Sequence, residues 1–232
     1  MTLLADTKKK AKTFIQLTRK ETRITAGDAE MATLQARFAE NHWLVLPRFV
    51  ERGLMNEIRD SLLKKAVYYN KKHKGLAHEL CMRNNSASQL LHFLINDGRV
   101  YDFIRQVTGC PPIGCFHGRV YRMEPDSPHH HKWHSDWSHH RMIAMSINLG
   151  AQPYQGGGLQ MREKDGEPFT EVFNTGYGDA LIFRLGENLE HRVTDVTGAV
   201  DKTAFAGWFA ARPKYTRSLR SSIVGRRPSG KK

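Results

Sequence analysis

The spacing of hydrophobic positions divides the chain into a front part with helical periodicity and a back part with strand-like runs. In residues 28–41 apolar side chains recur every three to four positions, which predicts an amphipathic helix with Asp28 as its N-cap. The apolar run 43–50 is broken by Pro47, which is typical of a strand that ends in a turn. The chain is thus expected to begin with one helix and one short strand.

Three further segments before residue 111 have helical spacing. Residues 51–72 present an apolar face and a basic outer face, which predicts a long amphipathic helix. Residues 86–97 and 98–109 predict two more helices, the second with Gly109 as its stop signal. The front of the chain is therefore expected to form a helical layer.

From residue 111 onward, short runs of β-branched and aromatic residues alternate with glycine and proline. These strand-like runs are residues 114–123, 141–150, 156–162, 170–175, 179–185, 190–196 and 202–211. Six or seven short strands with turn signals between them are typical of a sandwich or jelly roll. The predicted fold class is α+β, mainly β.

Charge changes the picture of the two ends. The net charge is +13, and the whole excess lies in residues 1–25 and 212–232, so residues 26–211 are neutral. We therefore expect one domain over 26–211, with helical support over 26–110 and the β core over 111–211. A neutral body argues against a domain that grips duplex nucleic acid. The two basic tails are either solvated ends or contacts for an acidic partner, such as a carrier protein, RNA or a leader peptide.

Cysteine content and the absence of long apolar runs bear on location. The three cysteines, Cys81, Cys110 and Cys115, form no CxxC pair, which argues against a disulfide framework and fits a reducing compartment. No segment has the length or apolarity of a secretion signal or a membrane span. A cytoplasmic location is predicted, and the pattern leaves the oligomeric state open.

The stretch PHHHKWHSDWSHH, residues 128–140, holds six of the twelve histidines. If His134 and Asp136 lie on one strand, their side chains point the same way and offer an imidazole and a carboxylate. His191, the one histidine after residue 140, begins another strand-like run. Two histidines and a carboxylate make the facial triad of non-haem Fe(II) oxygenases, which leaves coordination positions open. The other five histidines of the stretch are expected in loops beside the ligand strand, as a polar rim: His129, His130, His131, His139 and His140.

Several motifs then follow one another in the order found in a known family. They are His134-Ser135-Asp136, the strand 141–150, Gly157-Gly158-Leu159, GDALIF at 178–183, His191, and GWF at 207–209. In this order they resemble the Fe(II)- and 2-oxoglutarate-dependent dioxygenases, in particular the prolyl-hydroxylase-like branch. The resemblance implies a double-stranded β-helix core (jelly-roll, cupin-like) with an N-terminal helical layer. It also implies an enzyme that uses Fe(II), 2-oxoglutarate and O2, with His134, Asp136 and His191 as metal ligands.

The resemblance also points to the cosubstrate site. The family binds 2-oxoglutarate through a basic residue on the last strand, and Lys202 occupies that place. Lys202, Ala204, Ala206 and Trp208 share one face of a strand, so the two alanines leave room beside a charge and an aromatic wall. Arg192 is expected on the opposite side of its own strand.

Other pocket residues are less fixed by the pattern. Asn148 matches a position that often contacts 2-oxoglutarate in the family. Of Tyr121 and Arg122, neighbours on an entering strand, one is expected to face inward, and the sequence leaves open which. Trp133 and Trp137 flank the ligands and are either substrate walls or rim aromatics.

The expected activity is hydroxylation of an unactivated C–H bond in a small-molecule, amino-acid or peptidyl substrate, with release of succinate and CO2. The carboxylate of Asp136 favours hydroxylation, desaturation or cyclisation, because halogenases of the family replace this residue with a small one. One alternative is a nucleic-acid demethylase of the same fold, whose arginine-rich signature is missing after His191. The others are a cupin-like metal enzyme that does not use 2-oxoglutarate, and a binding protein on a degenerate barrel.

Overall fold

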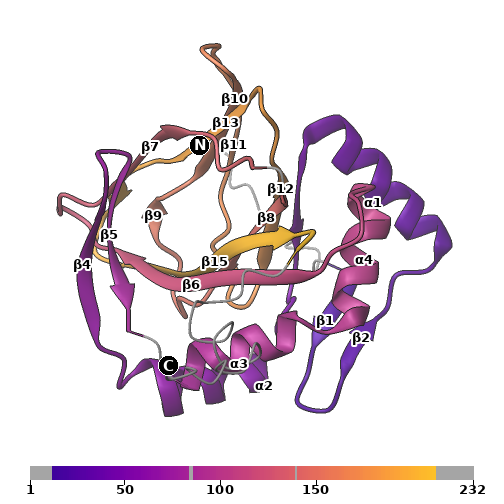
Figure 1. Ribbon diagram of the computed structural model, residues 1–232. Coiled ribbons are helices and arrows are strands. Elements are labelled where there is room, and N and C mark those ends of the chain that lie inside the picture. The colour runs from indigo at the N-terminus through magenta and orange to yellow at the C-terminus, as the bar shows by residue number, and fades with distance from the viewer. Residues whose placement is uncertain (1–11, 84–85, 139, 213–232) are drawn as a thin grey trace, which may run out of the picture.

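An antiparallel sheet curls around a central space, and helices pack along its outer side (Figure 1). The structure is a computed structural model that describes residues 12–83, 86–138 and 140–212. The strands of the large sheet are β3 (Trp43–Leu46), β4 (Tyr68–His73), β5 (Ala77–Met82), β6 (Cys115–Met123), β7 (His130–His134), β8 (Arg141–Asn148), β10 (Leu159–Glu163), β11 (Pro168–Val172), β12 (Ala180–Arg184), β13 (Leu189–Val193) and β15 (Lys202–Ala210). Their order across the sheet is β11-β10-β13-β7-β5-β6-β15-β8-β12-β3, with β4 beside β5. The predicted jelly-roll class is confirmed.

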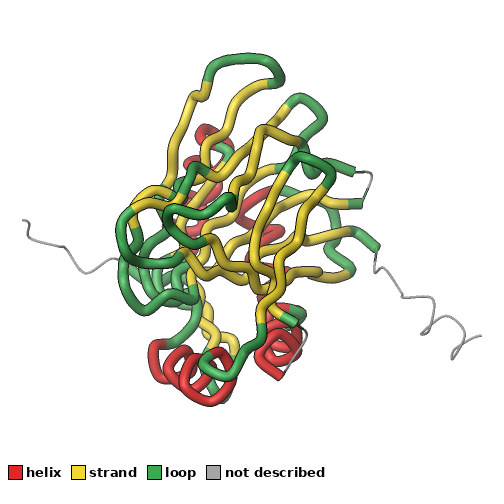
Figure 2. The backbone as a smooth tube through the Cα atoms, turned by 90° about the vertical axis from the view of Figure 1, so that its left-hand side faces the viewer, coloured by secondary structure: helices red, strands yellow, loops and turns green. Residues whose placement is uncertain are grey.

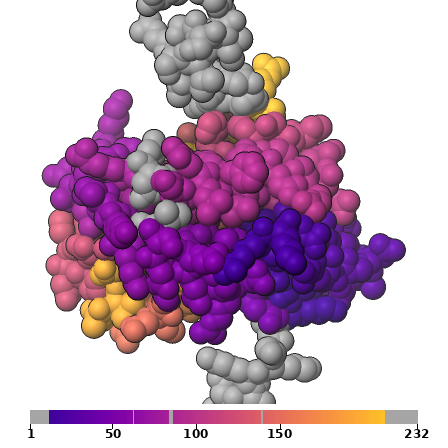
Figure 3. Space-filling view, turned by 90° about the horizontal axis from the view of Figure 1, so that it is seen from below, coloured from indigo at the N-terminus to yellow at the C-terminus, as the bar shows by residue number. Residues whose placement is uncertain are grey.

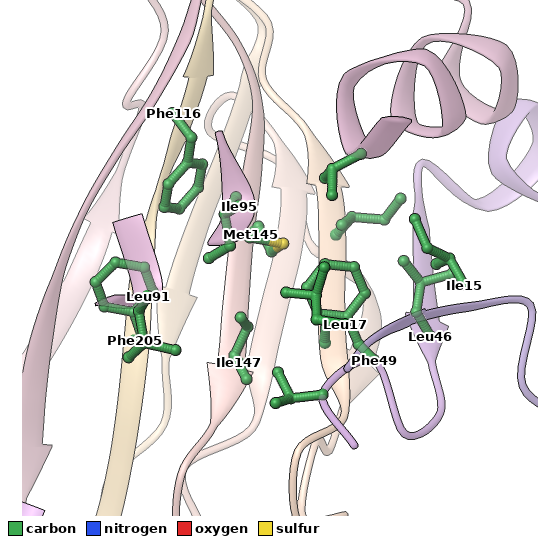
Figure 4. Close-up of a cluster of buried hydrophobic side chains, with 14 of the residues drawn as sticks. Ile15, Leu17, Leu46, Phe49, Leu91, Ile95, Phe116, Met145, Ile147 and Phe205 are labelled. Carbon is green, nitrogen blue, oxygen red and sulfur yellow. The ribbon is translucent and has the colours of Figure 1, made fainter. Parts of the chain in front are cut away.

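In Figure 1 the helices lie to the right of the curled sheet and below it, and the tube view in Figure 2 also shows helices below the strands. They are α1 (Asp28–Asn41), α2 (Arg52–Glu57) followed by the π-helical turn η1 (Ile58–Leu63), α3 (Ser86–Ile95) and α4 (Gly98–Thr108). Leu91 and Ile95 of α3 enter the same buried cluster as Phe116 and Phe205 of the sheet (Figure 4). Burying this apolar face of the helices against the sheet is what keeps the strands curled.

Gly109 ends α4 in the left-handed conformation, as the sequence predicts, with a φ of 67°. At the start of α1 the structure differs from the prediction, because Gly27 is the N-cap and Asp28 is the first helical residue. Glu30 still closes the helix start, since its carboxylate accepts a hydrogen bond from the backbone N–H of Gly27.

The prediction of one helix over residues 51–72 is wrong in its second half. The helix stops at Leu63, and β4 begins at Tyr68. β4 forms a hairpin with β5, and its turn places Lys74 and Gly75 at positive φ. Pairing with β5 and the strand preference of adjacent tyrosines override the helical spacing of the apolar residues. This hairpin brings His73, Leu76 and Ala77, which follow the predicted helix, to the wall of the central cavity.

Part of the predicted N-terminal tail is folded. The strands β1 (Ile15–Leu17) and β2 (Thr22–Ile24) pair as a hairpin, and Ile15 and Leu17 are fully buried. The backbone N–H of Leu17 donates to the carbonyl of Phe49 at 2.6 Å, which fastens the hairpin to the domain. In the view from below, this indigo segment lies directly against its neighbours (Figure 3). The rest of the predicted tails, 1–11 and 213–232, lies outside the described residues.

A small separate sheet forms between β9 (Gln155–Gly156) and β14 (Val196–Thr197). Figure 1 shows β9 inside the curl of the large sheet. No helix among the described residues is both long and apolar enough to cross a membrane.

Two facing glycines let β6 and β15 approach closely. Gly118 and Gly207 are register partners, and a Cβ on Gly207 would lie 1.8 Å from the carbonyl oxygen of His117. Gly207→Ala is therefore expected to lower the free energy of unfolding by about 1–3 kcal/mol, because the strands must separate. Urea unfolding measures this loss. Gly98→Ala is the matched control, since a Cβ there meets nothing within 4 Å, and an equal effect of both changes would contradict this account.

Candidate active site

A cavity of about 290 Å³ occupies the centre of the curled sheet. Side chains from β6, β7, β8, β10, β12, β13 and β15 line it, and so does the β4–β5 hairpin. The lining includes all three side chains that the sequence suggests as metal ligands. The curl of the sheet thus collects residues from across the whole β region into one space.

His134, Asp136 and His191 come together on one wall of this cavity. β7 and β13 are paired with His134 directly opposite His191. The Oδ2 atom of Asp136 lies 3.7 Å from Nε2 of His134 and 3.5 Å from Nε2 of His191. One atom from each residue can be chosen so that all three lie within 4.8 Å of one another. Two imidazole nitrogens and a carboxylate oxygen at this spacing fit Fe(II), which prefers such a mixed donor set.

Asp136 reaches this position in a different way from the prediction. Strand β7 ends at His134, so Asp136 belongs to the following loop rather than to the same strand face. The indole N–H of Trp208 donates to Oδ2 of Asp136 at 2.9 Å, and Arg141 lies 3.4 Å from Oδ1. These two contacts turn the carboxylate toward the histidines.

Burial and the contacts among the three residues set their charge states, and although burial would lower the pKa of His134, its contacts with Asp136 and the Lys132 carbonyl raise it. Burial would raise the pKa of Asp136, but hydrogen bonds with His134 and His191 hold it well below its usual range. Burial lowers the pKa of His191, so its ring is neutral. The Nδ1–H of His134 donates to the carbonyl oxygen of Lys132 at 2.7 Å, which leaves Nε2 with a free lone pair toward the cavity.

Lys202 lies at the other end of the cavity, at the start of β15. Its side chain is buried, and Nζ donates to the carbonyl oxygen of Gly157 at 2.6 Å. The ring of Tyr154 is 5.7 Å from Nζ. Burial lowers the pKa of Lys202 to about 7. Ala204, Ala206 and Trp208 also line the cavity, so the face of β15 that the sequence singles out is the one that faces inward.

The structure places the remaining candidates of the sequence. Tyr121 faces the cavity, while Arg122 stacks on Tyr68, outside the lining. Asn148 lines the cavity, but its amide is engaged with the backbone of Gly150 and Gly176. Asn148 therefore orders the adjoining loops, and its contact with a cosubstrate stays a prediction.

Neither tryptophan beside the ligands lines the cavity. The ring of Trp133 lies under the guanidinium groups of Arg162 and Arg192, 4.5 and 4.9 Å from its centroid. Arg192 accordingly points away from the cavity, as expected for a neighbour of His191. Trp137 is 40% exposed at the surface. Of the two alternatives for Trp133 and Trp137, substrate walls or rim aromatics, the structure fits the second.

The expectation that the other histidines lie in loops needs correction. His130 and His131 belong to strand β7, because the strand begins earlier than the HxD motif suggests. His131 lines the cavity, and its Nε2–H donates to Oε2 of Glu79 at 2.8 Å. His129 is buried and accepts a hydrogen bond from the backbone of Glu124. His139 lies outside the described residues.

A buried carboxylate beside the cavity was not predicted. Glu79 on β5 has no exposed surface, and its oxygens accept bonds from Arg119 at 2.6 Å, His131 at 2.8 Å and His73 at 3.2 Å. Burial would raise the pKa of Glu79, but these partners hold it well below its usual range. Arg119 already occupies the oxygen that faces His73 and Cys81, so this cluster is an ion-pair network rather than a second metal site. Sequence reasoning missed Glu79 because it predicted no element between residues 73 and 85, where β5 lies.

The comparisons with known proteins agree with this site. Residues 118–210 match the model of the 2OG-Fe(II) oxygenase superfamily. This match and the His-Asp-His cluster support a dioxygenase that uses Fe(II), 2-oxoglutarate and O2. No curated protein sequence matches the chain significantly.

Solved structures share the fold at low sequence identity. A 2OG-Fe(II) oxygenase family oxidoreductase from Burkholderia pseudomallei has a TM-score of 0.61 at 18% identity and covers 83% of this chain and 96% of its own. A prolyl hydroxylase from Trichoplax adhaerens, in complex with a hypoxia inducible factor peptide fragment, has a TM-score of 0.57 at 13% identity, with coverage of 81% and 94%. The epimerase SnoN, in complex with Fe3+, alpha ketoglutarate and nogalamycin RO, has a TM-score of 0.54 at 14% identity, with coverage of 89% and 93%. These likenesses show that the chain shares the fold of these proteins.

Proposed function

We propose that His134, Asp136 and His191 hold the Fe(II) ion and that Lys202 binds the distal carboxylate of 2-oxoglutarate. The enzyme then hydroxylates an unactivated C–H bond of a small-molecule, amino-acid or peptidyl substrate, with succinate and CO2 as coproducts. The observation that carries this proposal is the placement of a His-Asp-His cluster and a buried lysine in one cavity.

The residues of this chain divide the work of the cavity. Trp208 and Arg141 fix the carboxylate of Asp136, and the carbonyl of Lys132 fixes the ring of His134. When bound, Fe(II) and 2-oxoglutarate supply the oxidising chemistry with O2. Lys202 holds the cosubstrate in one orientation, so that its keto acid end faces the metal ligands.

Lys202 is well placed for this role. Its Nζ atom reaches the carbonyl of Gly157, at the end of the cavity away from Trp208 and Asp136. A carboxylate bound there would give the buried amine of Lys202 an opposite charge beside its hydrogen bond to the carbonyl of Gly157. Tyr154 stands beside Nζ and narrows the site around one carboxylate.

Two observations support oxidation of a C–H bond in a small or peptidyl substrate. The carboxylate of Asp136 occupies the position at which a halogenating site would be open, which favours hydroxylation. The structurally similar proteins include one bound to a peptide fragment and one bound to nogalamycin RO. A cavity of about 290 Å³ is small for a ligand site, since such sites usually measure roughly 300–1,000 Å³.

Succinate production tests the proposed function. Protein purified without oxygen is supplied with Fe(II), 2-oxoglutarate and then O2, with and without candidate substrates, and succinate is measured by mass spectrometry. We expect succinate well above the background of the His134→Ala variant. Production that never exceeds that background would rule the proposal out.

The affinity for 2-oxoglutarate is expected to fall as the pH rises above 7. Free Lys202 has a pKa of about 7, and a bound carboxylate requires the charged form, so each pH unit above 7 weakens binding roughly tenfold. Burial raises the pKa values of Tyr121 and Tyr154 and lowers that of His131, so these neighbours keep their neutral forms in this range. Anaerobic titration of the weak visible band of the Fe(II)–2-oxoglutarate complex measures the affinity.

Lys202→Arg provides the control for this pH dependence. A guanidinium stays charged throughout, so the affinity of this variant is expected to be flat between pH 6.5 and 8.5. The same downward slope in the wild type and the arginine variant would show that another group titrates.

A further inference from the structure

Besides Lys202 and Arg141, Arg119 lines the cavity, and the proposed chemistry does not use it. It lies on β6, lines the cavity and is 30% exposed there. Fe(II) and Lys202 between them account for both carboxylates of 2-oxoglutarate. An accessible guanidinium in the same space is therefore available to another ligand.

The strand register places Arg119 toward the metal end of the cavity. Lys202 is the register partner of Met123, whereas Arg119 is the partner of Ala206, four residues further along β15. At about 3.3 Å per residue, this separates the two positions by roughly 13 Å along the strand. Two residues beyond Ala206, Trp208 holds the carboxylate of Asp136. Arg119 thus lies at the level where a substrate meets the metal, and away from the cosubstrate anchor.

The buried ion pair holds this guanidinium in place. The bond to Glu79 uses the Nε–H of Arg119 at 2.6 Å, and Glu79 is itself held by His131 at 2.8 Å. Glu79 has no exposed surface, so the pairing lies in the wall and the exposed part of Arg119 lies in the cavity. A guanidinium fixed through Nε keeps its Nη groups for a planar acceptor, and a carboxylate matches that geometry.

The rest of this wall fits a small amphipathic ligand. His73 and Leu76, at the turn of the β4–β5 hairpin, line the cavity beside Arg119, and Leu76 is 47% exposed. An apolar contact at the hairpin and a charged contact at Arg119 suit a ligand that has an apolar part and an anionic group. The volume of about 290 Å³ must hold 2-oxoglutarate as well, which limits the enclosed part of the substrate to roughly amino-acid size.

From this arrangement we infer that the substrate carries a carboxylate that Arg119 binds, and that it is a free amino acid or a small carboxylic acid. The inference rests on the proposed function and narrows its substrate class. Binding the carboxylate at a fixed wall position would determine which C–H bond faces the metal, because the distance between the two groups is set by the protein.

The test uses paired ligands that differ in one charge. Wild-type protein loaded with Fe(II) and 2-oxoglutarate is titrated without oxygen with the common amino acids, their N-acetyl derivatives and short carboxylic acids. Each compound is paired with its primary amide. Changes in the visible band of the complex report binding, and succinate formed after O2 is added reports turnover. We expect at least one carboxylate to bind roughly tenfold or more tightly than its amide, since a charge-assisted bond is lost in the amide.

Three variants assign this preference to Arg119. In Arg119→Lys, the charge beside Glu79 remains but the planar group is lost. In the double variant Arg119→Met/Glu79→Gln, both buried charges are removed together, which protects folding. In both variants the ratio of the affinity for the carboxylate to that for its amide is expected to fall roughly tenfold. Their affinity for 2-oxoglutarate is expected to stay within about threefold of the wild-type value. Arg122→Met is the matched control, because Arg122 is on the same strand but outside the cavity.

The outcomes separate the two proposals. If the visible band forms but no carboxylate is preferred over its amide, the assignment of Arg119 fails and the proposed function stands. If the Arg119 variants weaken 2-oxoglutarate binding as much as they weaken ligand binding, Arg119 contacts the cosubstrate and the inference is overturned. If the wild type forms no band at all, the proposed function itself fails.

Discussion

His191→Ala is expected to reduce 2-oxoglutarate turnover by at least about a thousandfold, because one of three proposed metal ligands is lost. His191 is buried at the centre of the site, with its Nε2 atom 3.5 Å from the carboxylate of Asp136. Two remaining ligands cannot hold the ion as tightly in the open geometry that the chemistry needs. The loss is measured as succinate formed per enzyme, alongside Fe(II) content determined by metal analysis.

A matched histidine separates this effect from general damage to the fold. His130 is on the same strand as His134 but does not line the cavity. His130→Ala is expected to keep its iron content and to retain turnover within a few-fold of the wild type. Retention of both iron and activity in His191→Ala would contradict the proposed ligand set.

Lys202→Met is expected to weaken 2-oxoglutarate binding strongly while making the fold more stable. Removing the charge partner of a buried carboxylate should weaken the affinity at least about a hundredfold. The same change removes a buried amine whose charged form is disfavoured, and is expected to raise the free energy of unfolding at pH 7 by about 1–3 kcal/mol. Titration of the visible band measures the first effect, and urea unfolding measures the second.

The sign of the stability effect depends on pH. In the wild type, burial lowers the pKa of Lys202 from 10.5 to about 7, so the unfolded chain binds more protons between these values. The stability contribution of Lys202 therefore rises with pH over this window and is least favourable at pH 7 and below. The advantage of Lys202→Met should accordingly shrink as the pH approaches 10. An advantage that grows with pH, or a variant less stable at pH 7, would contradict the burial of the lysine.

The sequence predicted the β core well because each strand there carries its own signal. Glycines and turn residues mark the ends of the short β-rich runs, and the order of motifs from His134 to Phe209 indicates the fold class. Alternation along the last strand predicts that Lys202 and Trp208 share the face that lines the cavity. Strand alternation alone could not choose between Tyr121 and Arg122. That choice depends on register with β15, where Tyr121 faces Ala204.

The front of the chain was harder to predict, for a physical reason. Strands β4 and β5, residues 68–82, form a hairpin, and β5 pairs with β6 and β7; such distant partners leave no local pattern. Glu79 and Arg119 were missed with it, because a buried ion pair is visible only once two strands are side by side. Asp136 was assigned to a strand because the HxD spacing suits one, yet the loop brings its carboxylate to the same point.

The central claim is that one ferrous ion is held by three side chains from β7, the loop after it and β13. The most direct measurement is a crystal structure of the protein grown without oxygen with Fe(II) and 2-oxoglutarate, with anomalous diffraction collected at the iron edge. The account predicts one anomalous peak within bonding distance of Nε2 of His134, Asp136 and Nε2 of His191, with the distal carboxylate of the cosubstrate at Lys202. A peak beside Glu79 and His73, or none at the three residues, would contradict it.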